Sequence, residues 1–429
     1  FLFLCMSGCG SREKTVLKWA LFNCISDVTG YQEAVNEGLR EKGIDCEIEF
    51  VNISSDYAGH YGEYVEPYWQ ALEEGGYDII GMLGNWSYLE MYPAAVRRGL
   101  LLPLDPMLEE RESGKKLREA YPESTWEAVK VDGAVYGAAT PYLGYNCYLV
   151  FDLDRAEEYR LDLNELSEED LEACLRLAAE GESARGNQGF TPVSYLNYRP
   201  GPDYEESGCE FIAFDVSGEI PVAKNILYEE PYLERMRTLT KWREEGLIVL
   251  DGGRAMEEGN FLADTVYSYS PEAAEYQTAR RSPKTTDRLR AVAFPRMNGI
   301  YGRGTKTGIA ASSAHREAAF DVLAEIYSDA GLSNALVYGT AGKDYELVDG
   351  RVVRDEKSTG EYEKMYFGNP FLTLPDSNDS PDKTQGLYEA AGTRPLSGLT
   401  GWSFDPSEVE TELNRLNDCW LEHSGFSCG

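Results

Sequence analysis

Residues 15–22 are TVLKWALF, a run of β-branched, aliphatic and aromatic residues that predicts a buried β-strand. Two more stretches in this part of the chain predict strands, CEIEFVNI at 46–53 and YDIIGML at 77–83. Between them, YQEAVNEGLREKG, which ends at Gly43, and YWQALEEGG at 68–76 predict helices. Strands and helices alternating at this spacing favour a parallel sheet with crossover helices, so we expect an α/β fold.

The middle of the chain continues the mixture of strands and helices. Asp132-Gly133, within VDGAVYG, predicts a tight hairpin turn, and YNCYLVF at 145–151 predicts a strand. In LSEEDLEACLRLAAEG at 166–181, Ser167 is expected to be the N-cap of a helix that ends before Gly181. EPYLERMRTLTKWREEGL at 230–247 predicts a further helix, because its apolar residues share one face.

Composition restricts the kind of protein. The 429 residues include 40 Lys and Arg against 74 Asp and Glu, which gives a formal net charge of -34. Such a surface repels nucleic-acid phosphates and anionic lipid headgroups, so nucleic acid is not an expected partner. Nine cysteines are scattered without a CxxC spacing, and the three histidines, His60, His315 and His423, lie far apart. We therefore expect neither a metal site nor any other cofactor.

The first residues, FLFLCMSGCGSREK, combine an apolar run with a cysteine that small and charged residues follow. Residues 1–8 are interpreted as the remnant of a secretory signal peptide. MSGC at 6–9 resembles a bacterial lipobox, which implies that Cys9 carries a diacylglyceryl group and that residues 9–15 form a lipidated tether. No other apolar stretch approaches the roughly 20 residues that a membrane-spanning helix needs.

Several stretches resemble the extracellular solute-binding lipoproteins of bacterial ABC importers, in particular family 1, the carbohydrate type. They are YDIIGMLGNWSYLEMYPAAVRRGLLLPLDPML at 77–108, WEAVKVDGAVYGAATP at 126–141, LTKWREEGLI at 239–248, ALVYGTAGKDYELVDGRVV at 335–353 and FGNPFL at 367–372. The resemblance covers Val16 to about Asn417. It implies a non-enzymatic, lipid-anchored monomer on the outer face of a Gram-positive cell membrane. Such a protein captures a carbohydrate, here an oligosaccharide, and delivers it to the permease.

The resemblance also implies a two-lobed, periplasmic-binding-protein-like fold, in which each lobe is a sheet flanked by helices and the ligand cleft lies between the lobes. Residues 16–141 would form the first part of lobe 1, and residues 142–265 the main part of lobe 2. Residues 266–429 would contain interlobe crossings and the segments that complete both lobes. We expect crossings near 140–146 and 266–307. Loops at the carboxyl ends of parallel strands would then converge on the cleft.

The candidate ligand-binding residues follow from these positions. Asn23 and Asp27 come after the first strand, although Asp27 is also well placed to cap the next helix. A sugar offers hydroxyl groups and an apolar ring face, so amides and aromatic rings suit it. The other candidates follow the third strand or lie at the crossings: Asn85, Trp86, Tyr88, Tyr142, Tyr145, Tyr267 and Tyr269. Packing in the core is the alternative for Trp86, and packing at the hinge for Tyr142 and Tyr145.

Each alternative ligand or function would require particular residues or motifs in the sequence. A peptide or amino acid would need a fixed positive group, which Arg303 or Arg199 could supply. A ligand-sensing lipoprotein not tied to transport is a further alternative. GRGTKTG at 302–308 lacks the Gly-Lys-Thr order of a phosphate loop, and no Gly-x-Ser-x-Gly elbow occurs. The 74 acids do not exclude a glycosidase pair by number alone, but no motif places one.

Lipidation of Cys9 is directly testable. Cys9→Ala should block signal-peptide processing and change where the protein resides, because acyl chains contribute about 0.8 kcal/mol of membrane affinity per buried methylene. Mass spectrometry of the wild-type mature N-terminus should find Cys9 modified. An unmodified Cys9, or a mature chain that begins at another residue, would contradict the interpretation.

Overall fold

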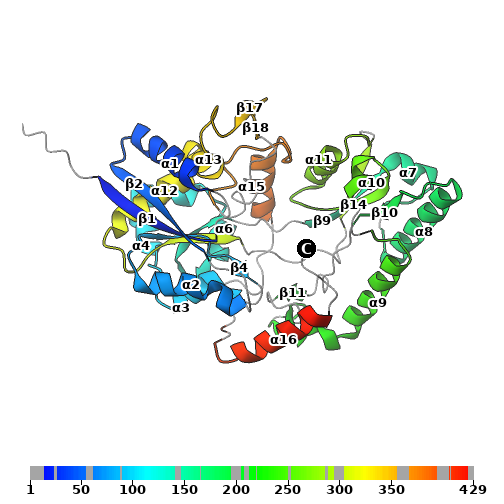
Figure 1. The fold of residues 1–429 in the computed structure, drawn as a ribbon, viewed down its shortest axis with the longest axis horizontal. Helices are drawn as coiled ribbons and strands as arrows, with labels where there is room; N and C mark the ends of the chain where they lie inside the picture. Colours follow the sequence, from blue (N-terminus) through cyan, green and yellow to red (C-terminus); the bar gives the residue numbers. More distant parts are fainter. Residues whose placement is uncertain are drawn as a thin grey trace, which may run out of the picture.

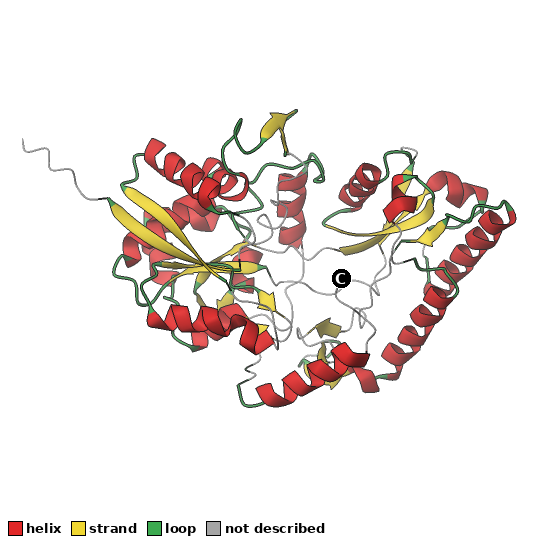
Figure 2. Ribbon diagram, viewed as in Figure 1, coloured by secondary structure: helices red, strands yellow, loops and turns green. Residues whose placement is uncertain are grey.

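The computed structural model describes residues 14–23, 27–54, 61–86, 89–140, 146–164, 166–194, 204–206, 212–218, 220–249, 253–285, 288–293, 304–354, 367–393, 405 and 407–423. Figure 1 shows two lobes side by side, and Figure 2 shows that helices flank the sheet of each lobe. Lobe 1 is built on a five-stranded sheet and lobe 2 on a four-stranded sheet. The two-lobed α/β fold expected from the sequence is confirmed.

The sheet of lobe 1 has the strand order β2-β1-β3-β16-β8. These strands are β1 (Thr15–Phe22), β2 (Cys46–Ile53), β3 (Ile79–Ile80), β16 (Thr305–Ile309) and β8 (Gly137–Thr140). β1 pairs in parallel with β2 and β3, whereas β16 is antiparallel to both β3 and β8. The predicted parallel core is confirmed, but the third strand is shorter than expected because regular pairing is interrupted at Met82, which has a φ of 56°.

Helices cover both faces of this sheet. Its first helices are α1 (Thr29–Glu41), α2 (Tyr61–Glu74), α3 (Met91–Arg97), α4 (Asp105–Glu110), α5 (Glu112–Glu119) and α6 (Glu123–Ala128), and α12 (Arg316–Ser328) and α13 (Ala330–Tyr338) come later in the chain. α1 packs on α13, where a β-carbon at Gly38 would lie 2.6 Å from Cδ2 of Leu332. Gly38 therefore allows the two helices to approach closely. Trp19 is fully buried at the centre of the lobe-1 core.

The sheet of lobe 2 has the order β10-β14-β9-β15, formed by β10 (Thr191–Val193), β14 (Phe261–Ser268), β9 (Asn146–Asp152) and β15 (Leu289–Ala293). β9 is antiparallel to both of its neighbours. The helices of this lobe are α7 (Leu153–Glu158), α8 (Glu168–Ala184), α9 (Glu230–Glu244), α10 (Gly253–Glu257) and α11 (Pro271–Arg281). Leu149, Leu175 and Trp242 are buried together in the lobe-2 core, which confirms the apolar faces predicted for α8 and α9.

Local sequence signals predicted one hairpin turn and one helix start correctly, and one helix end incorrectly. Asp132 and Gly133 have φ of 52° and 83° between β6 (Lys130–Val131) and β7 (Ala134–Val135), as a tight hairpin requires. Ser167 and Asp170 form the predicted capping box of α8. However, α8 does not end before Gly181 but continues to Ala184. A β-carbon at Gly181 would lie 2.4 Å from Cε1 of Tyr159, so this glycine makes room for the tyrosine ring instead.

The remaining elements are short strands, one 3₁₀ helix and two α-helices. They are β4 (Asn85–Trp86), β5 (Leu89–Glu90), β11 (Tyr204–Glu206), β12 (Ile212–Asp215), β13 (Val222–Asn225), the 3₁₀ helix η1 (Ile226–Tyr228), β17 (Glu346–Val348), β18 (Arg351–Val353), α15 (Lys383–Thr393) and α16 (Glu410–His423). Within the described ranges, no helix has both the length and the apolar character needed to cross a membrane.

The chain passes between the two sheets at two places along the described elements. β8 ends at Thr140 in lobe 1 and β9 begins at Asn146 in lobe 2; β15 ends at Ala293 in lobe 2 and β16 begins at Thr305 in lobe 1. The connecting residues 141–145 and 294–303 lie outside the described ranges. The ends of β8 and β16 that join these connections are therefore on the side of lobe 1 that faces lobe 2 (Figure 1).

Candidate functional site

One edge of the lobe-1 sheet collects the ends of several strands. β1, β2, β3 and β8 run in the same direction, so their carboxyl ends lie together, and the amino end of the antiparallel β16 joins them. We call this the lobe-1 carboxyl edge. It contains Asn23, the loop 81–86 after β3, Thr140 and Thr305. In an open α/β sheet, such an edge is where a ligand usually binds.

Two residues at this edge have left-handed backbone conformations. Asn23, directly after β1, has φ of 45°, and Met82, two residues after β3, has φ of 56°. Asparagine tolerates this region, but a bulky methionine adopts it rarely. Such conformations are concentrated at ligand-binding sites, where the surrounding structure must impose them. Their occurrence on the adjacent strands β1 and β3 therefore marks this edge independently of any sequence motif.

Backbone hydrogen bonds hold the loop after β3 in place. Leu83 N–H donates to the carbonyl of Lys306 at 3.1 Å, and Lys306 N–H donates back to the carbonyl of Leu83 at 3.2 Å. Met91 N–H, at the start of α3, donates to the carbonyl of Gly84 at 3.0 Å. The loop is thus fixed to β16 on one side and to α3 on the other. It continues into the β4–β5 hairpin, in which Trp86 pairs with Leu89.

This arrangement places the backbone of Asn85 and Trp86 in a short hairpin beyond the sheet rather than in a core strand. Their side chains lie outside what the structure describes, so their roles remain as predicted from the sequence. Asn23 is half-buried, and its N–H donates to the carbonyl of Ile53 at 3.0 Å, which ties the ends of β1 and β2 together. Three of the predicted residues therefore have backbone at the lobe-1 carboxyl edge.

The edge also contains a buried cation that sequence reasoning missed. The side chain of Lys306 is almost fully buried; its Nζ donates to the carbonyl of Gly304 at 2.7 Å and lies 5.7 Å from the centre of the Tyr92 ring. A single lysine in TKTGI gives no warning of burial, because lysines in strands are normally exposed. The consequence is a buried lysine side chain one residue from the amino end of β16.

The other described candidates have partners within the protein. The Asp27 carboxylate accepts the Thr29 N–H at 3.0 Å, and hydrogen bonds from Thr29 hold the pKa of Asp27 below its ordinary value. Asp27 therefore forms a turn just before α1, whose N-cap is Val28 without a side-chain cap hydrogen bond. Tyr267 packs against the lobe-2 core. Tyr269 is 8% exposed and donates a hydrogen bond to Oδ1 of Asp382 at 3.3 Å.

The remaining predicted residues lie outside the described ranges. They are Cys9, Tyr88, Tyr142, Tyr145 and Arg303. The free cysteines among the described residues are Cys46, Cys147, Cys174 and Cys419, of which Cys147 and Cys174 are buried. Among the described residues, no cluster of three His, Cys, Asp or Glu side chains could hold a metal ion.

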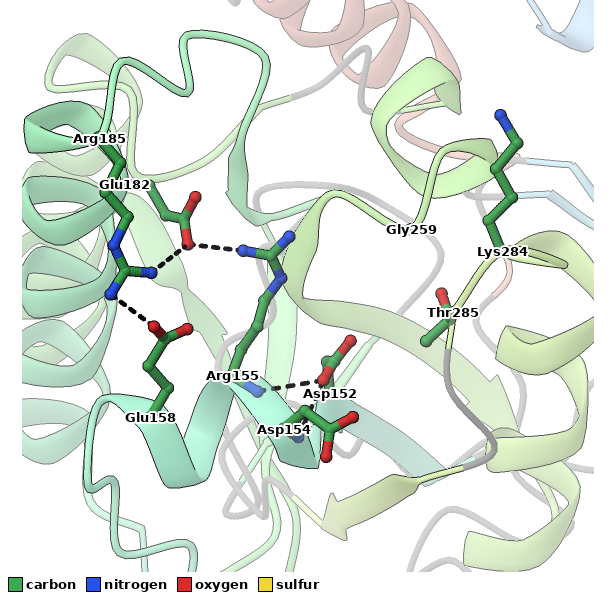
Figure 3. A pocket seen from close by; sticks show the side chains of 9 residues that line it. All are labelled: Asp152, Asp154, Arg155, Glu158, Glu182, Arg185, Gly259, Lys284 and Thr285. Carbon is green, nitrogen blue, oxygen red and sulfur yellow. Dashed lines mark hydrogen bonds and ion pairs between the residues drawn. The ribbon is translucent and has the colours of Figure 1, made fainter.

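A pocket of about 440 Å³ lies elsewhere, at the far end of the lobe-2 sheet. Figure 3 shows its charged side chains, with Arg155 on one wall and Lys284 and Thr285 on the opposite wall. Arg155 Nη1 pairs with Glu182 Oε1 at 2.7 Å, and Asp152 Oδ1 accepts the Asp154 N–H at 3.0 Å as the cap of α7. Because β9 runs from the interlobe connection to Asp152, the pocket lies at the end of the strand away from lobe 1.

The charges of this pocket stabilise the lobe. Glu182 is 4% exposed and also accepts hydrogen bonds from Tyr159 Oη at 2.8 Å and from Asn187 Nδ2. Burial alone would raise the pKa of Glu182, but hydrogen bonds from Asn187 and Tyr159 and the charges of Arg155 and Arg185 hold it below its ordinary value. We therefore interpret this pocket as a recess formed by a structural ion network.

A Ser, His and Asp grouping in lobe 1 does not have the connectivity of a catalytic triad. Ser313 Oγ donates to Asp78 Oδ1 at 2.6 Å, and His315 Nδ1 lies 3.3 Å from the same oxygen. In a triad the histidine lies between the serine and the acid, whereas here the acid lies between the other two. Asp78 also accepts the Lys18 N–H at 3.0 Å, so it fixes the edge of the sheet opposite the lobe-1 carboxyl edge.

Comparisons with solved structures identify the fold. NgtS, the N-glycan transport solute-binding protein of Streptococcus pneumoniae, superposes with a TM-score of 0.65, covering 96% of this chain and 90% of NgtS at 17% identity. The solute receptor AcbH, described with an exclusive preference for β-D-galactopyranose, superposes at 0.52, covering 96% and 93% at 12% identity. The alginate-binding protein AlgQ2 superposes at 0.51, covering 97% and 84% at 14% identity.

At these identities the likeness establishes the fold. The chain has the two-lobed fold of the sugar and oligosaccharide solute-binding proteins of ABC importers, as the sequence resemblance implied. No family model matches the sequence. The curated proteins likewise contain no match.

The ion network of lobe 2 yields a test. Glu182→Gln should lower the free energy of unfolding by about 3 kcal/mol at pH 7, because it removes one partner of a buried ion pair. The folded-state pKa of Glu182 is lowered, so its contribution is present above the unfolded value of about 4.3 and is lost as the pH falls through the folded value. The difference from wild type should therefore shrink in acid.

Chemical denaturation at pH 7 and pH 3 measures both effects. Glu158→Gln is the matched control, since Glu158 pairs with Arg185 in the same pocket but is 42% exposed, and its loss should cost less than about 1 kcal/mol. Equal losses for the two variants would show that the buried network does not carry the stability assigned to it.

Proposed function

We propose that this protein is the substrate-binding component of a bacterial ABC importer and that it captures a carbohydrate, most simply an oligosaccharide, for delivery to the permease. The observation that carries the proposal is the lobe-1 carboxyl edge, which faces lobe 2 and includes two left-handed residues. The fold it shares with NgtS, AcbH and AlgQ2 supports the same function. Binding needs no chemistry from the protein, in keeping with a non-enzymatic role.

The proposed ligand contacts are those at or next to this edge. Asn23 and Asn85 would bond sugar hydroxyl groups, and Trp86 would stack on the apolar face of a ring. Tyr88, Tyr142 and Tyr145 remain proposed contacts because of their positions in the sequence. A sugar held there would also touch lobe 2, so contacts made only in the closed arrangement would favour closure.

A second candidate ligand class carries a carboxylate, for which Arg303 or Arg199 could supply the fixed positive group. A peptide, an amino acid or an acidic sugar would supply such a carboxylate. The formal charge of -34 opposes any anionic ligand at long range, so we rank the neutral carbohydrate first.

The anchor and the partners complete the proposal. A lipid on Cys9 would hold the protein at the outer face of the cell membrane, where it would meet the permease as a monomer. The lipobox-like MSGC at 6–9 supports this part, and the mass of the mature N-terminus tests it.

Calorimetric screening tests the proposed ligand class. The probes are neutral manno-, malto- and galacto-oligosaccharides, an alginate trisaccharide, and a tripeptide. We expect a neutral oligosaccharide to bind and to make the particle more compact in small-angle X-ray scattering. Binding of the tripeptide alone would transfer the proposal to a peptide receptor, and binding without compaction would contradict capture by closure.

Trp86→Ala examines the proposed stacking contact. If the indole stacks on a sugar ring, its loss should weaken binding of the oligosaccharide found in the screen by about 2 kcal/mol, roughly 30-fold. Trp86→Tyr should retain much of the affinity, because it keeps an aromatic face. Tyr228→Ala, at an 83% exposed tyrosine next to β13, is the control and should leave the affinity unchanged. A Trp86→Ala protein that loses thermal stability but keeps its affinity would identify the indole as core.

A further inference from the structure

The two lobes are joined by a compact contact that lies outside the proposed ligand site. Tyr269, at the end of lobe-2 strand β14, has its ring in the hydrophobic cluster of lobe 1. There it packs on Gly386 of α15, where a β-carbon would lie 2.5 Å from Cε2 of Tyr269. The Tyr269 hydroxyl donates to Oδ1 of Asp382 at 3.3 Å. An aromatic ring from one lobe is therefore seated directly on the backbone of the other.

Two arginines extend this contact along α11. Nη1 of Arg351, on β18, donates to Tyr276 Oη at 2.5 Å and to the carbonyls of Asp376 at 3.3 Å and Asp379 at 3.0 Å. Its guanidinium also lies 4.7 Å from the centre of the Tyr276 ring, a cation–π geometry. Nε of Arg280, near the end of α11, donates to the carbonyl of Ser377 at 3.1 Å.

The lobe-1 side of this contact moves with lobe 1. Lys383 is buried at the start of α15, and its Nζ lies 3.2 Å from Thr373 Oγ1, from the Leu374 carbonyl and from Asp379 Oδ2. Val352 N–H donates to the Pro375 carbonyl at 2.9 Å, which attaches this segment to β18. Residues 376–386 are thus fixed to lobe 1 at both ends.

The lobe-2 side is fixed just as firmly to lobe 2. Glu275 Oε1, on α11, accepts the Ala291 N–H of β15 at 2.9 Å. Thr278 Oγ1 donates to the buried Asp264 of β14 at 3.1 Å, and Arg281 pairs with the same carboxylate. Helix α11 therefore moves as part of lobe 2. The contact between α11 and residues 376–386 lies between two rigid bodies.

We propose that Tyr269, Gly386 and Arg351 form the pivot on which the two lobes turn, and that they are positioning residues which set the angle between the lobes. The relevance of this pivot to ligand capture rests on the proposed function. Closely packed surfaces with few degrees of freedom favour small rotations over separation. This side of the molecule stays joined, so lobe 2 would rotate about it relative to the lobe-1 carboxyl edge. Tyr269 therefore acts on binding through lobe orientation and not by touching the ligand.

A single methyl group at Gly386 tests the pivot. Gly386→Ala should wedge the contact, because the added β-carbon would collide with the Tyr269 ring. Gly392→Ala is the matched control: Gly392 is on the same helix, and a β-carbon there meets no atom within 4 Å. Both variants gain the same helix propensity, so any difference between them comes from the wedge.

Small-angle X-ray scattering of the ligand-free proteins is the readout, with circular dichroism to verify folding. We expect a larger radius of gyration for Gly386→Ala than for Gly392→Ala and wild type. Adding Tyr269→Leu to Gly386→Ala should restore the wild-type value, since the shorter side chain removes the collision. Arg351→Met should broaden the distribution of particle sizes while leaving the fold intact, and it serves as the second test if Gly386→Ala does not fold.

Radii of gyration that are equal for Gly386→Ala, Gly392→Ala and Arg351→Met would overturn the pivot. Because the measurement uses no ligand, it stands apart from the ligand class. A protein that binds no sugar but responds to the wedge would retain the pivot and lose the proposed function. A protein that binds sugar but whose radius of gyration is unchanged by Gly386→Ala would retain the proposed function and lose the pivot.

Discussion

The parallel pairing of β1 with β2 and β3 is the constraint on which the rest of this structure depends. It is held by burial: Trp19 lies at the centre of β1, opposite Phe50 of β2 and Ile79 of β3, with no exposed surface. Parallel strands must be connected by crossovers, so α1 and α2 cover the sheet, and the carboxyl ends of all three strands lie at one edge. The position of the proposed ligand site follows from this geometry before any side chain is considered.

Most of the charged groups discussed above stabilise the lobes and do not lie at the proposed ligand site. In lobe 2, Glu182 and Arg155 neutralise each other inside a network that lines the lobe-2 pocket. In lobe 1, Asp78 ties Lys18, Ser313 and His315 together at the edge opposite the proposed site. Lys306 differs from these groups because its buried side chain lies at the lobe-1 carboxyl edge.

The proposed ligand contacts and the contact between the lobes come from distant parts of the chain. Residues that would touch a ligand lie near the ends of β1 and β3, whereas the contact that controls lobe orientation involves α11, β18 and α15. Under the proposed function, the protein would respond to a ligand only as far as the ligand favours one lobe arrangement over another. Affinity would then depend on packing at Gly386 as well as on hydrogen bonds at Asn23 and Asn85.

The sequence by itself determined the features that depend on a few neighbouring residues. The first three strands of lobe 1, the hairpin at Asp132-Gly133, the capping box at Ser167 and the end of α1 before Gly43 were all predictable, because local backbone preference and apolar spacing specify them. The edge of the sheet where a site should lie was predictable for the same reason, since strand direction follows from the alternation with helices.

Only the tertiary structure decided what depends on contacts between distant residues. Gly181 looked like a helix stop, but the ring of Tyr159 requires it inside α8. Tyr269 looked like a ligand contact, but it is seated on Gly386, more than a hundred residues further along the chain. The left-handed Met82 and the buried Lys306 had no local signal at all, because the pairing of the loop after β3 with β16 creates both environments. Packing between distant segments outweighs the weak preferences of single residues, and it assigned these four residues their places.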